Sequence, residues 1–238
     1  MNLACLILAA SLGRAQAPAV STGAFSEPDR LYFHRHQGRN LEDSISLLGG
    51  MDQGDAAVLW RLGRGLLRLG ERRPAKADKL AEYTRAEGLL KKAVELAPSD
   101  PQAHYWYGIS MGRRGQVRGV LRSLFLVKPL RREMRAVLEL DPKSGAAHHV
   151  LGEMLMELPA IAGGSRKEGV RELEKAAELE PDYSPHFTAL AEAYLAVGEK
   201  AKAEAALKHI FDIKIPADPG EYDDNVKAAR ELLEKLGG

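Results

Sequence analysis

This chain of 238 residues has few cysteine and aromatic residues and almost no net charge. The single Cys excludes a disulfide framework, a cysteine-based zinc site and an iron–sulfur cluster. With 34 basic and 33 acidic residues the net charge is +1, so the chain is not a polycation and we expect no nucleic-acid partner. After the first dozen residues no apolar run is long enough to cross a bilayer, so we expect no stable membrane span.

The residues that are abundant favour helices. Hydrophobic residues make up 45% of the chain and charged residues 28%, which is enough apolar material for a folded core. Ala, Leu, Glu, Lys and Arg dominate, aromatics are only 6%, and runs of β-branched residues are rare. This composition predicts an all-α protein.

The first seventeen residues resemble a secretory signal peptide. An apolar run at 3–12 is followed by Arg14 and by Ala15-Gln16-Ala17, a small-x-small cleavage pattern. No Lys or Arg precedes the run, and Pro18 would follow the cut, so an N-terminal core helix is the alternative. We expect export, cleavage after Ala17 and a periplasmic or secreted location.

Three helical runs end in nearly the same four residues. The ends are Glu-Leu-Ala-Pro at 95–98, Glu-Leu-Asp-Pro at 139–142 and Glu-Leu-Glu-Pro at 178–181. Their prolines are 44 and 39 residues apart, and Pro216 follows 35 residues later. Helix–turn–helix units with periods near 34 residues resemble the tetratricopeptide repeat.

The last repeat shows the large-then-small pattern of that family most fully. Its pattern residues are Phe187, Leu190, Ala191, Tyr194, Gly198, Ala203 and Leu207. Gly and Ala allow the paired helices to approach closely, and the large residues fill the space between them. Earlier repeats keep a Gly after a large residue at 62–63, 107–108 and 151–152, with insertions of about ten residues before the second helix.

These patterns predict a tetratricopeptide-like, right-handed solenoid of antiparallel helix pairs with a C-terminal capping helix. We expect a signal peptide at 1–17 and an N-terminal extension with a degenerate repeat at 18–54. The solenoid itself should occupy 55–216 and the capping helix 217–238.

Two segments allow a closer comparison. Residues 106–142, from Trp106-Tyr107-Gly108 to the second repeat end, and the Leu-Pro-Ala-Ile-Ala-Gly-Gly-Ser insert at 158–165 resemble bacterial exported T-component proteins associated with TRAP transporters. They also resemble the eukaryotic regulator of microtubule dynamics family. The first resemblance implies an extracytoplasmic protein that works beside a solute-binding partner. Neither resemblance supplies a catalytic motif.

The candidate catalytic and metal motifs lack their structural context. Gly108-Ile109-Ser110-Met111-Gly112 matches G-x-S-x-G, but no strand precedes it, and a nucleophile elbow requires one. His34 and His36 are two residues apart and His148 and His149 are adjacent, so neither pair shares a helix face. We therefore expect no enzyme, no metal site and no cofactor, and assign His104 and His148 to packing.

Helical spacing places six residues on the first helices of the repeats, which line a concave groove in tetratricopeptide proteins. The predicted ligand-binding residues are Trp60, Arg64, Tyr105, Arg113, His149 and Glu153. The two arginines would hold a carboxylate on a small ligand or a partner peptide, and the aromatic rings would form an apolar wall.

Charge along the chain is polarised. Residues 111–143 contain nine basic and three acidic residues, and residues 168–238 contain sixteen acidic and nine basic residues. Solvated helix faces with i,i+4 pairs explain such segments without any function. End-to-end association of basic and acidic faces into a homo-oligomer is another explanation.

These expectations describe a non-catalytic, exported binding or scaffold protein. The first hypothesis is an accessory to solute uptake that binds a small organic acid or a solute-binding protein in its groove. The alternative is an assembly scaffold of the cell envelope that binds a protein partner or peptide segment and no small molecule.

Overall fold

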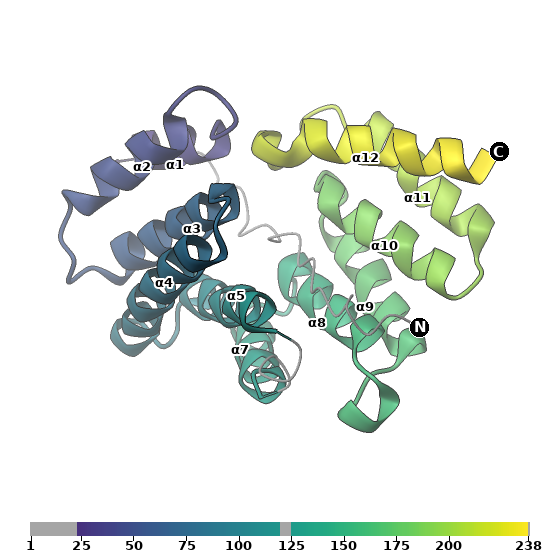
Figure 1. Cartoon of the computed structure of the whole chain (residues 1–238), viewed down its shortest axis with the longest axis horizontal. Helices are drawn as coiled ribbons and strands as arrows, with labels where there is room; N and C mark the ends of the chain where they lie inside the picture. The colour runs from purple at the N-terminus through teal and green to yellow at the C-terminus, as the bar shows by residue number, and fades with distance from the viewer. Residues whose placement is uncertain (1–22, 120–124, 238) are drawn as a thin grey trace. The chain divides into compact units, whose positions relative to one another are not determined.

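The computed structural model describes residues 23–119 and 125–237 and contains no strand in these two ranges (Figure 1). The predicted signal peptide and its cleavage site lie outside the described residues. The chain forms two compact units, one ending at Pro142 and the other beginning at Lys143. Each unit is built from helices that pack mainly on their neighbours along the chain.

The first unit contains three antiparallel pairs of helices within its described residues. Sequential helices α1 and α2, α3 and α4, and α5 and α7 form these pairs. The helices are α1 (Ser26–Phe33), α2 (Asn40–Gly49), α3 (Ala56–Arg72), α4 (Lys76–Leu96), α5 (Pro101–Arg118) and α7 (Val127–Leu140).

The second unit contains two helix pairs and a final helix within its described residues. In Figure 1, α12 lies along α10 and α11, which both contact it. The elements are α8 (Gly145–Glu157), the 3₁₀ turn η2 (Ala160–Ala162), α9 (Arg166–Leu179), α10 (Ser184–Ala196), α11 (Lys200–Asp212) and α12 (Pro219–Gly237). The all-α tetratricopeptide-like fold with a C-terminal capping helix is therefore confirmed.

Glycine at one position of the first helix lets three of the helix pairs close. A Cβ atom at Gly63 would lie 2.5 Å from Leu90, one at Gly108 2.5 Å from Met134, and one at Gly152 2.7 Å from Leu173. In each case the neighbour belongs to the second helix of the same pair. Because real Cβ atoms essentially never approach so closely, a side chain at any of these three sites would have to displace its neighbour.

Side-chain caps fix where several helices begin. Asp55 accepts a hydrogen bond from Ala57 N at 2.7 Å, and Asp100 accepts one from Gln102 N at 2.8 Å. Ser165 accepts one from Glu168 N at 3.3 Å and is the N-cap of α9. Each cap satisfies a backbone N–H that has no partner inside its helix.

The inserted residues form longer helices and ordered connections. Only three residues join α3 to α4, but eight residues, 158–165, join α8 to α9. Within this connection Gly163 has a φ of 85°, and Ser165 N donates to Leu155 O at 2.9 Å. The Gly-Gly pair is therefore part of a tight turn held by backbone hydrogen bonds.

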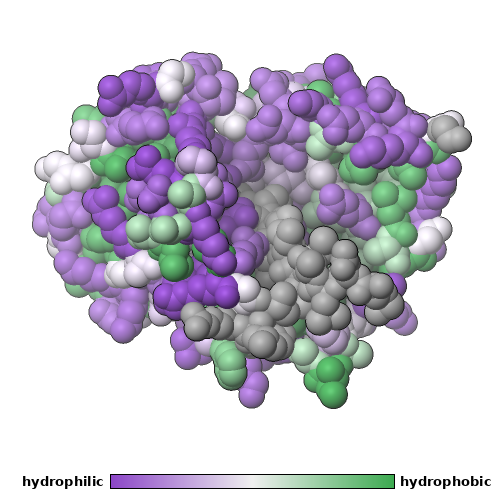
Figure 2. Space-filling view, in the orientation of Figure 1, coloured by the Kyte–Doolittle hydropathy of each residue, from purple (hydrophilic) through white to green (hydrophobic). Residues whose placement is uncertain are grey.

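On the side drawn in Figure 2, hydrophilic side chains dominate the described surface and apolar ones form small separate patches. The most exposed large apolar residues are Phe125, Ile161 and Ile215, at 82, 99 and 82%. Among the described helices, none is both long and apolar enough to cross a membrane.

Candidate functional site

One face of α3 carries a row of arginines that contacts α1. Arg61, Arg64 and Arg68 are three and four residues apart, so they share this face. Asp29 of α1, only 2% exposed, accepts hydrogen bonds from Arg61 Nε at 3.0 and 3.1 Å and from Arg64 Nη2 at 2.7 Å. One buried carboxylate thus binds two guanidinium groups. We call Trp60 and these three arginines the α3 arginine face.

Aromatic rings cover the same guanidinium groups. Arg64 Cζ lies 3.6 Å from the centroid of the Tyr32 ring. Arg61 Cζ lies 4.1 Å from the ring centroids of both Phe25 and Trp60. Burial lowers the pKa of Arg61, and the nearby Asp29 carboxylate opposes that change. The arrangement recognises a carboxylate by hydrogen bonds and an aromatic ring by cation–π contact.

A second carboxylate joins α3 to α5. Glu71 Oε2 accepts from Arg68 at 3.1 Å, and Glu71 Oε1 lies 3.0 Å from Arg113. Burial alone would raise the pKa of Glu71, but the charges of Arg68 and Arg113 outweigh it and hold the pKa below its ordinary value. Glu71 is therefore an ionised link between two helices.

The second unit has a buried histidine pair in the equivalent place, between α8 and α10. His149 and His186 are fully buried, and their Nδ1 atoms are 2.9 Å apart, so one imidazole donates to the other. His186 Nε2 lies 3.2 Å from Glu180, which also accepts from Ala146 N at 3.3 Å. His149 Nε2 lies 3.4 Å from Glu153. These contacts tie the two helices and the end of α9 together.

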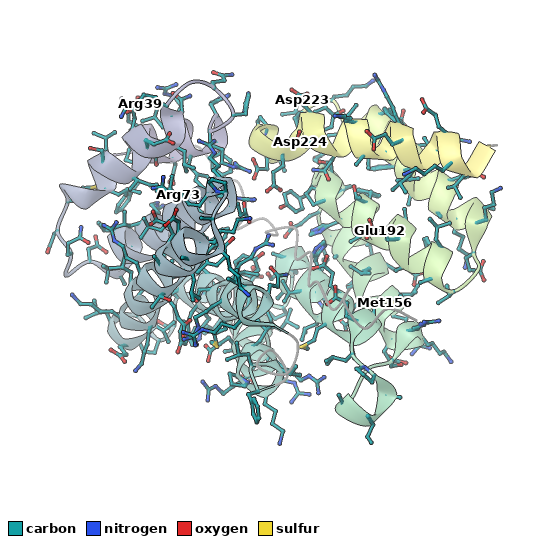
Figure 3. All side chains as sticks on the ribbon, in the orientation of Figure 1. Arg39, Arg73, Met156, Glu192, Asp223 and Asp224 are labelled. Atoms are coloured by element: carbon teal, nitrogen blue, oxygen red, sulfur yellow. The ribbon has the colours of Figure 1, made fainter. Side chains whose placement is uncertain are left out.

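Glu192 adds a further carboxylate to this side of the second unit. Figure 3 shows it on α10, between Met156 of α8 and Asp224 of α12. The side chain of Glu192 is exposed, but partial desolvation and the neighbouring Glu153 raise its pKa, while His149 opposes the increase. The first helices of the second unit thus carry negative charge where α3 carries positive charge.

Of the six predicted ligand-binding residues, two lie on the α3 arginine face, two lie on α5 and two lie on α8 beside the histidine pair. Four of them are buried, at 7, 2, 1 and 0% exposure for Trp60, Arg64, Tyr105 and His149. Arg113 and Glu153 are partly exposed. The two arginines expected to hold a ligand carboxylate each bind a carboxylate of this chain, Arg64 through Asp29 and Arg113 through Glu71. That these six residues bind a ligand stays a prediction.

Sequence patterns did not identify three of the side chains that bind these residues. Glu71 follows Arg68 by three residues, a spacing that could have identified the pair. Asp29 precedes Arg61 and Arg64 by 32 and 35 residues, and His186 follows His149 by 37. No local pattern indicates partners at such separations.

The other motifs have structural roles where the chain is described. Ser110 of the G-x-S-x-G sequence is buried inside α5, and its hydroxyl donates to Tyr107 O at 2.7 Å. His104 Nδ1 lies 2.7 Å from Glu133, and His148 Nδ1 lies 2.6 Å from Glu172, each linking the two helices of a pair. Within the described ranges no three His, Cys, Asp or Glu side chains are grouped to hold a metal ion.

Part of the charge in the acidic segment lies in exposed pairs on single helices. Such pairs join Arg171 to Glu168 at 3.0 Å and Lys175 to Glu178 at 3.0 Å. In the basic segment Lys128 and Arg135 lie on α7, and residue 122 lies outside the described ranges.

Comparison with known proteins identifies similar sequences and a similar fold. The family model described as Regulator of microtubule dynamics protein 1-3 matches residues 34–161. Regulator of microtubule dynamics protein 1 of the mouse, Mus musculus, is 24% identical over 201 residues, covering 77% of this chain and 64% of the relative. The protein of the same name from cattle, Bos taurus, is 26% identical over 197 residues, covering 75% and 61%. The chain thus spans less than two thirds of the length of these relatives.

Among solved structures, a thermophilic tetratricopeptide repeat protein of Thermus thermophilus has a TM-score of 0.67 at 20% identity. The similarity covers 89% of this chain and all of the other. The predicted resemblances to tetratricopeptide proteins and to the regulator of microtubule dynamics family are confirmed.

The prediction of a periplasmic or secreted location is wrong. The relatives that match are mammalian regulators of microtubule dynamics, and a mammalian cell has no periplasm. The prediction depended on residues 1–17 and on the resemblance to exported bacterial proteins.

Proposed function

Because the chain belongs to the regulator of microtubule dynamics protein 1-3 family, we propose that it is a non-catalytic scaffold that binds a polypeptide segment on the first helices of its repeats. Tetratricopeptide folds present extended surfaces for such segments. One observation supports this most directly: the α3 arginine face already binds a helix, α1, through a carboxylate and an aromatic ring. A surface that recognises these groups within the chain has the chemistry to recognise them on a partner.

A protein partner fits the contacts better than a small organic acid. A small carboxylate would have to replace Asp29 on Arg64 or Glu71 on Arg113, and it would bring no covalently attached apolar residues to offset the lost burial. A polypeptide segment supplies both the carboxylate and the ring. The role in solute uptake depended on export, so the corrected location removes its main support.

The names of the relatives make microtubules the first partner class to test. The experiment measures growth rate and catastrophe frequency of microtubules assembled from purified subunits, with and without the full chain. Arg64→Met removes one charge from the α3 arginine face at nearly constant volume. Arg85→Met is the matched control, because Arg85 is exposed on α4, the second helix of its pair.

We expect the wild-type chain and Arg85→Met to change microtubule dynamics equally and Arg64→Met to have at most a tenth of their effect. Circular dichroism would verify that each variant is folded. Microtubules unaffected by the wild-type chain would refute this partner class. An equal effect of both variants would refute the α3 arginine face as the surface that binds the partner.

A further inference from the structure

The residues that bind the α3 arginine face belong to a short helix of the same chain. We propose that α1 is a displaceable internal ligand, occupying the surface on which α3 binds a partner helix with a carboxylate and, three residues later, an aromatic ring. This inference rests on the proposed function, and it adds the class of partner and the way in which binding is regulated.

The chemistry of the partner follows from what α1 presents. Asp29 and Tyr32 are three residues apart, so they lie on the same side of α1. Both arginine contacts of the carboxylate are between 2.7 and 3.1 Å, and the Tyr32 hydroxyl accepts from Arg68 Nε at 3.3 Å. A partner helix with Asp or Glu at one position and Tyr at the third position after it could form the same contacts.

Several features make α1 easy to displace. It has only eight residues, and Phe25, the N-cap residue that precedes it, provides no side-chain cap. An isolated helix of this length is unstable in water, so α1 depends on its contacts. The central contact is a buried ion pair, which contributes less net stability than apolar packing of the same size. The other side of α1 is held to α2 by a hydrogen bond from Ser44 to Pro28 O at 2.8 Å.

The family comparison separates the internal ligand from its binding surface. The matched region begins at residue 34, just after α1 ends at Phe33, and it includes all of α3. The arginines therefore lie within the part of the chain that the family model describes, and the carboxylate that occupies them lies outside it. This is the division expected if other segments bind to the same face.

Competition within one chain has a quantitative consequence. A tethered segment acts at an effective concentration of about millimolar, so it strongly reduces the apparent affinity of a free segment. If α1 leaves the α3 arginine face more often, a larger fraction of chains has that face open. The apparent dissociation constant of the free segment then decreases in proportion to the increase in this fraction. Weakening the Asp29 contact should therefore strengthen binding in trans.

The probe is a fluorescein-labelled peptide with the sequence of residues 24–37, measured by fluorescence polarisation against the full chain. Asp29→Asn keeps the shape of the side chain and removes its charge. Glu27→Gln is the matched control, because Glu27 is exposed on the same helix and pairs with Arg30 at 2.6 Å. Tyr32→Ala is a second way to weaken α1, and it leaves Asp29 in place for the two arginines.

We expect the peptide to bind the Asp29→Asn and Tyr32→Ala chains at least tenfold more tightly than the wild type or the Glu27→Gln chain. Adding Arg64→Met to Asp29→Asn should abolish this gain, and so should a peptide with Asn in place of Asp29. Hydrogen exchange should show faster exchange in α1 of the two weakened chains, with α3 and α4 still protected.

Equal peptide affinity for the wild-type chain and the two weakened chains would overturn the proposal. Slow hydrogen exchange in α1 of both weakened chains would overturn it as well. The result is independent of the microtubule experiment. If Arg64→Met loses the microtubule effect but the peptide binds none of the chains, the proposed scaffold function would stand and the proposal that α1 is an internal ligand would be rejected. Peptide binding without any microtubule effect would retain the internal ligand and reject that partner class.

Discussion

At the scale of single residues, the carboxylates of Glu71 and Glu192 have pKa values that move in opposite directions. Glu71 has two guanidinium groups within 3.1 Å, and they outweigh burial, so its pKa falls. Glu192 is exposed on α10, and partial desolvation together with the neighbouring carboxylate of Glu153 raises its pKa. Desolvation acts to raise the pKa of both carboxylates, and the sign of the neighbouring charge decides the direction of the final shift.

Replacing Glu71 by Gln should destabilise the protein at neutral pH and not in acid. Because the pKa of Glu71 is lower in the folded state than its ordinary value of 4.5 in the unfolded state, the ionised side chain stabilises the fold at pH values above 4.5. This stabilisation is lost as the pH falls through the folded-state pKa. We expect Glu71→Gln to reduce the free energy of unfolding at pH 7 by about 1–3 kcal/mol, measured by urea denaturation. The difference from the wild type should narrow towards pH 3.

Glu95→Gln provides the matched control for that measurement. Glu95 pairs with Lys91 at 3.7 Å on the exposed side of α4, where an ion pair contributes little. Equal stability of the Glu71→Gln and Glu95→Gln variants at pH 7 would show that the link between α3 and α5 is unimportant.

Replacing Glu192 by Gln should have the opposite effect. A raised folded-state pKa means that stability is fully present below the unfolded pKa and is lost as pH rises through the folded pKa. At pH 7 the ionised carboxylate therefore destabilises the fold, but because Glu192 is exposed and water screens its charge, Glu192→Gln should increase the free energy of unfolding by at most about 0.5 kcal/mol. Thermal unfolding at pH 7 and pH 4 tests this, and a gain of equal size at both pH values would contradict it.

At the scale of helix pairs, the glycine at one position of the first helix controls how closely the pair packs. A Cβ atom at Gly152 would lie 2.7 Å from Leu173 and 3.0 Å from the carbonyl oxygen of Gly169. The leucine can adjust its rotamer, but the backbone oxygen can move only with α9. The spacing of α8 and α9 is thus fixed by the absence of one methyl group.

Gly152→Ala should therefore destabilise the second unit by about 1–3 kcal/mol, in spite of the higher helix propensity of alanine. Gly88→Ala is the control, because Gly88 lies in α4 and nothing is within 4 Å of the position that a Cβ atom would occupy there. It should stabilise the chain by up to about 1 kcal/mol. Urea denaturation measures both, and a stabilising Gly152→Ala would show that α9 tolerates the displacement.

At the scale of the whole molecule, the chain contains two units that each have apolar residues of their own. In the second unit the core includes Leu173, Phe187, Leu207 and Ile210. In repeat proteins each element depends mainly on its neighbours along the chain, so damage to one core spreads only to adjacent helices. The contacts of this chain follow the same rule, since sequential helices account for most of them.

Leu207→Ala should consequently affect the two units differently. Leu207 is fully buried, and its truncation should cost about 2–5 kcal/mol through lost burial and a cavity. Hydrogen exchange should increase strongly in α10, α11 and α12 and remain slow in α3 and α4. Equal acceleration in α3 and α4 would show that the chain unfolds as one cooperative body.

The sequence by itself determined the helices, the repeat and the position of close approach in each pair. These features depend on residues within one helical turn or one repeat, such as Gly152 after Leu151 or the N-cap Ser165 before α9, and local spacing is readable from the chain. The location could not be read this way, because a short apolar leader pattern carries little information.

Only the tertiary structure decided what the charged residues of the first helices bind. Arg64 was expected to hold a carboxylate of a ligand or partner, which stays a prediction, and in the fold it binds Asp29, 35 residues earlier in the same chain. His149 likewise finds its partner 37 residues later, in His186. A buried charge must be paired with whatever group the fold brings within about 3 Å, and that group is set by which helix faces meet, not by its distance along the chain.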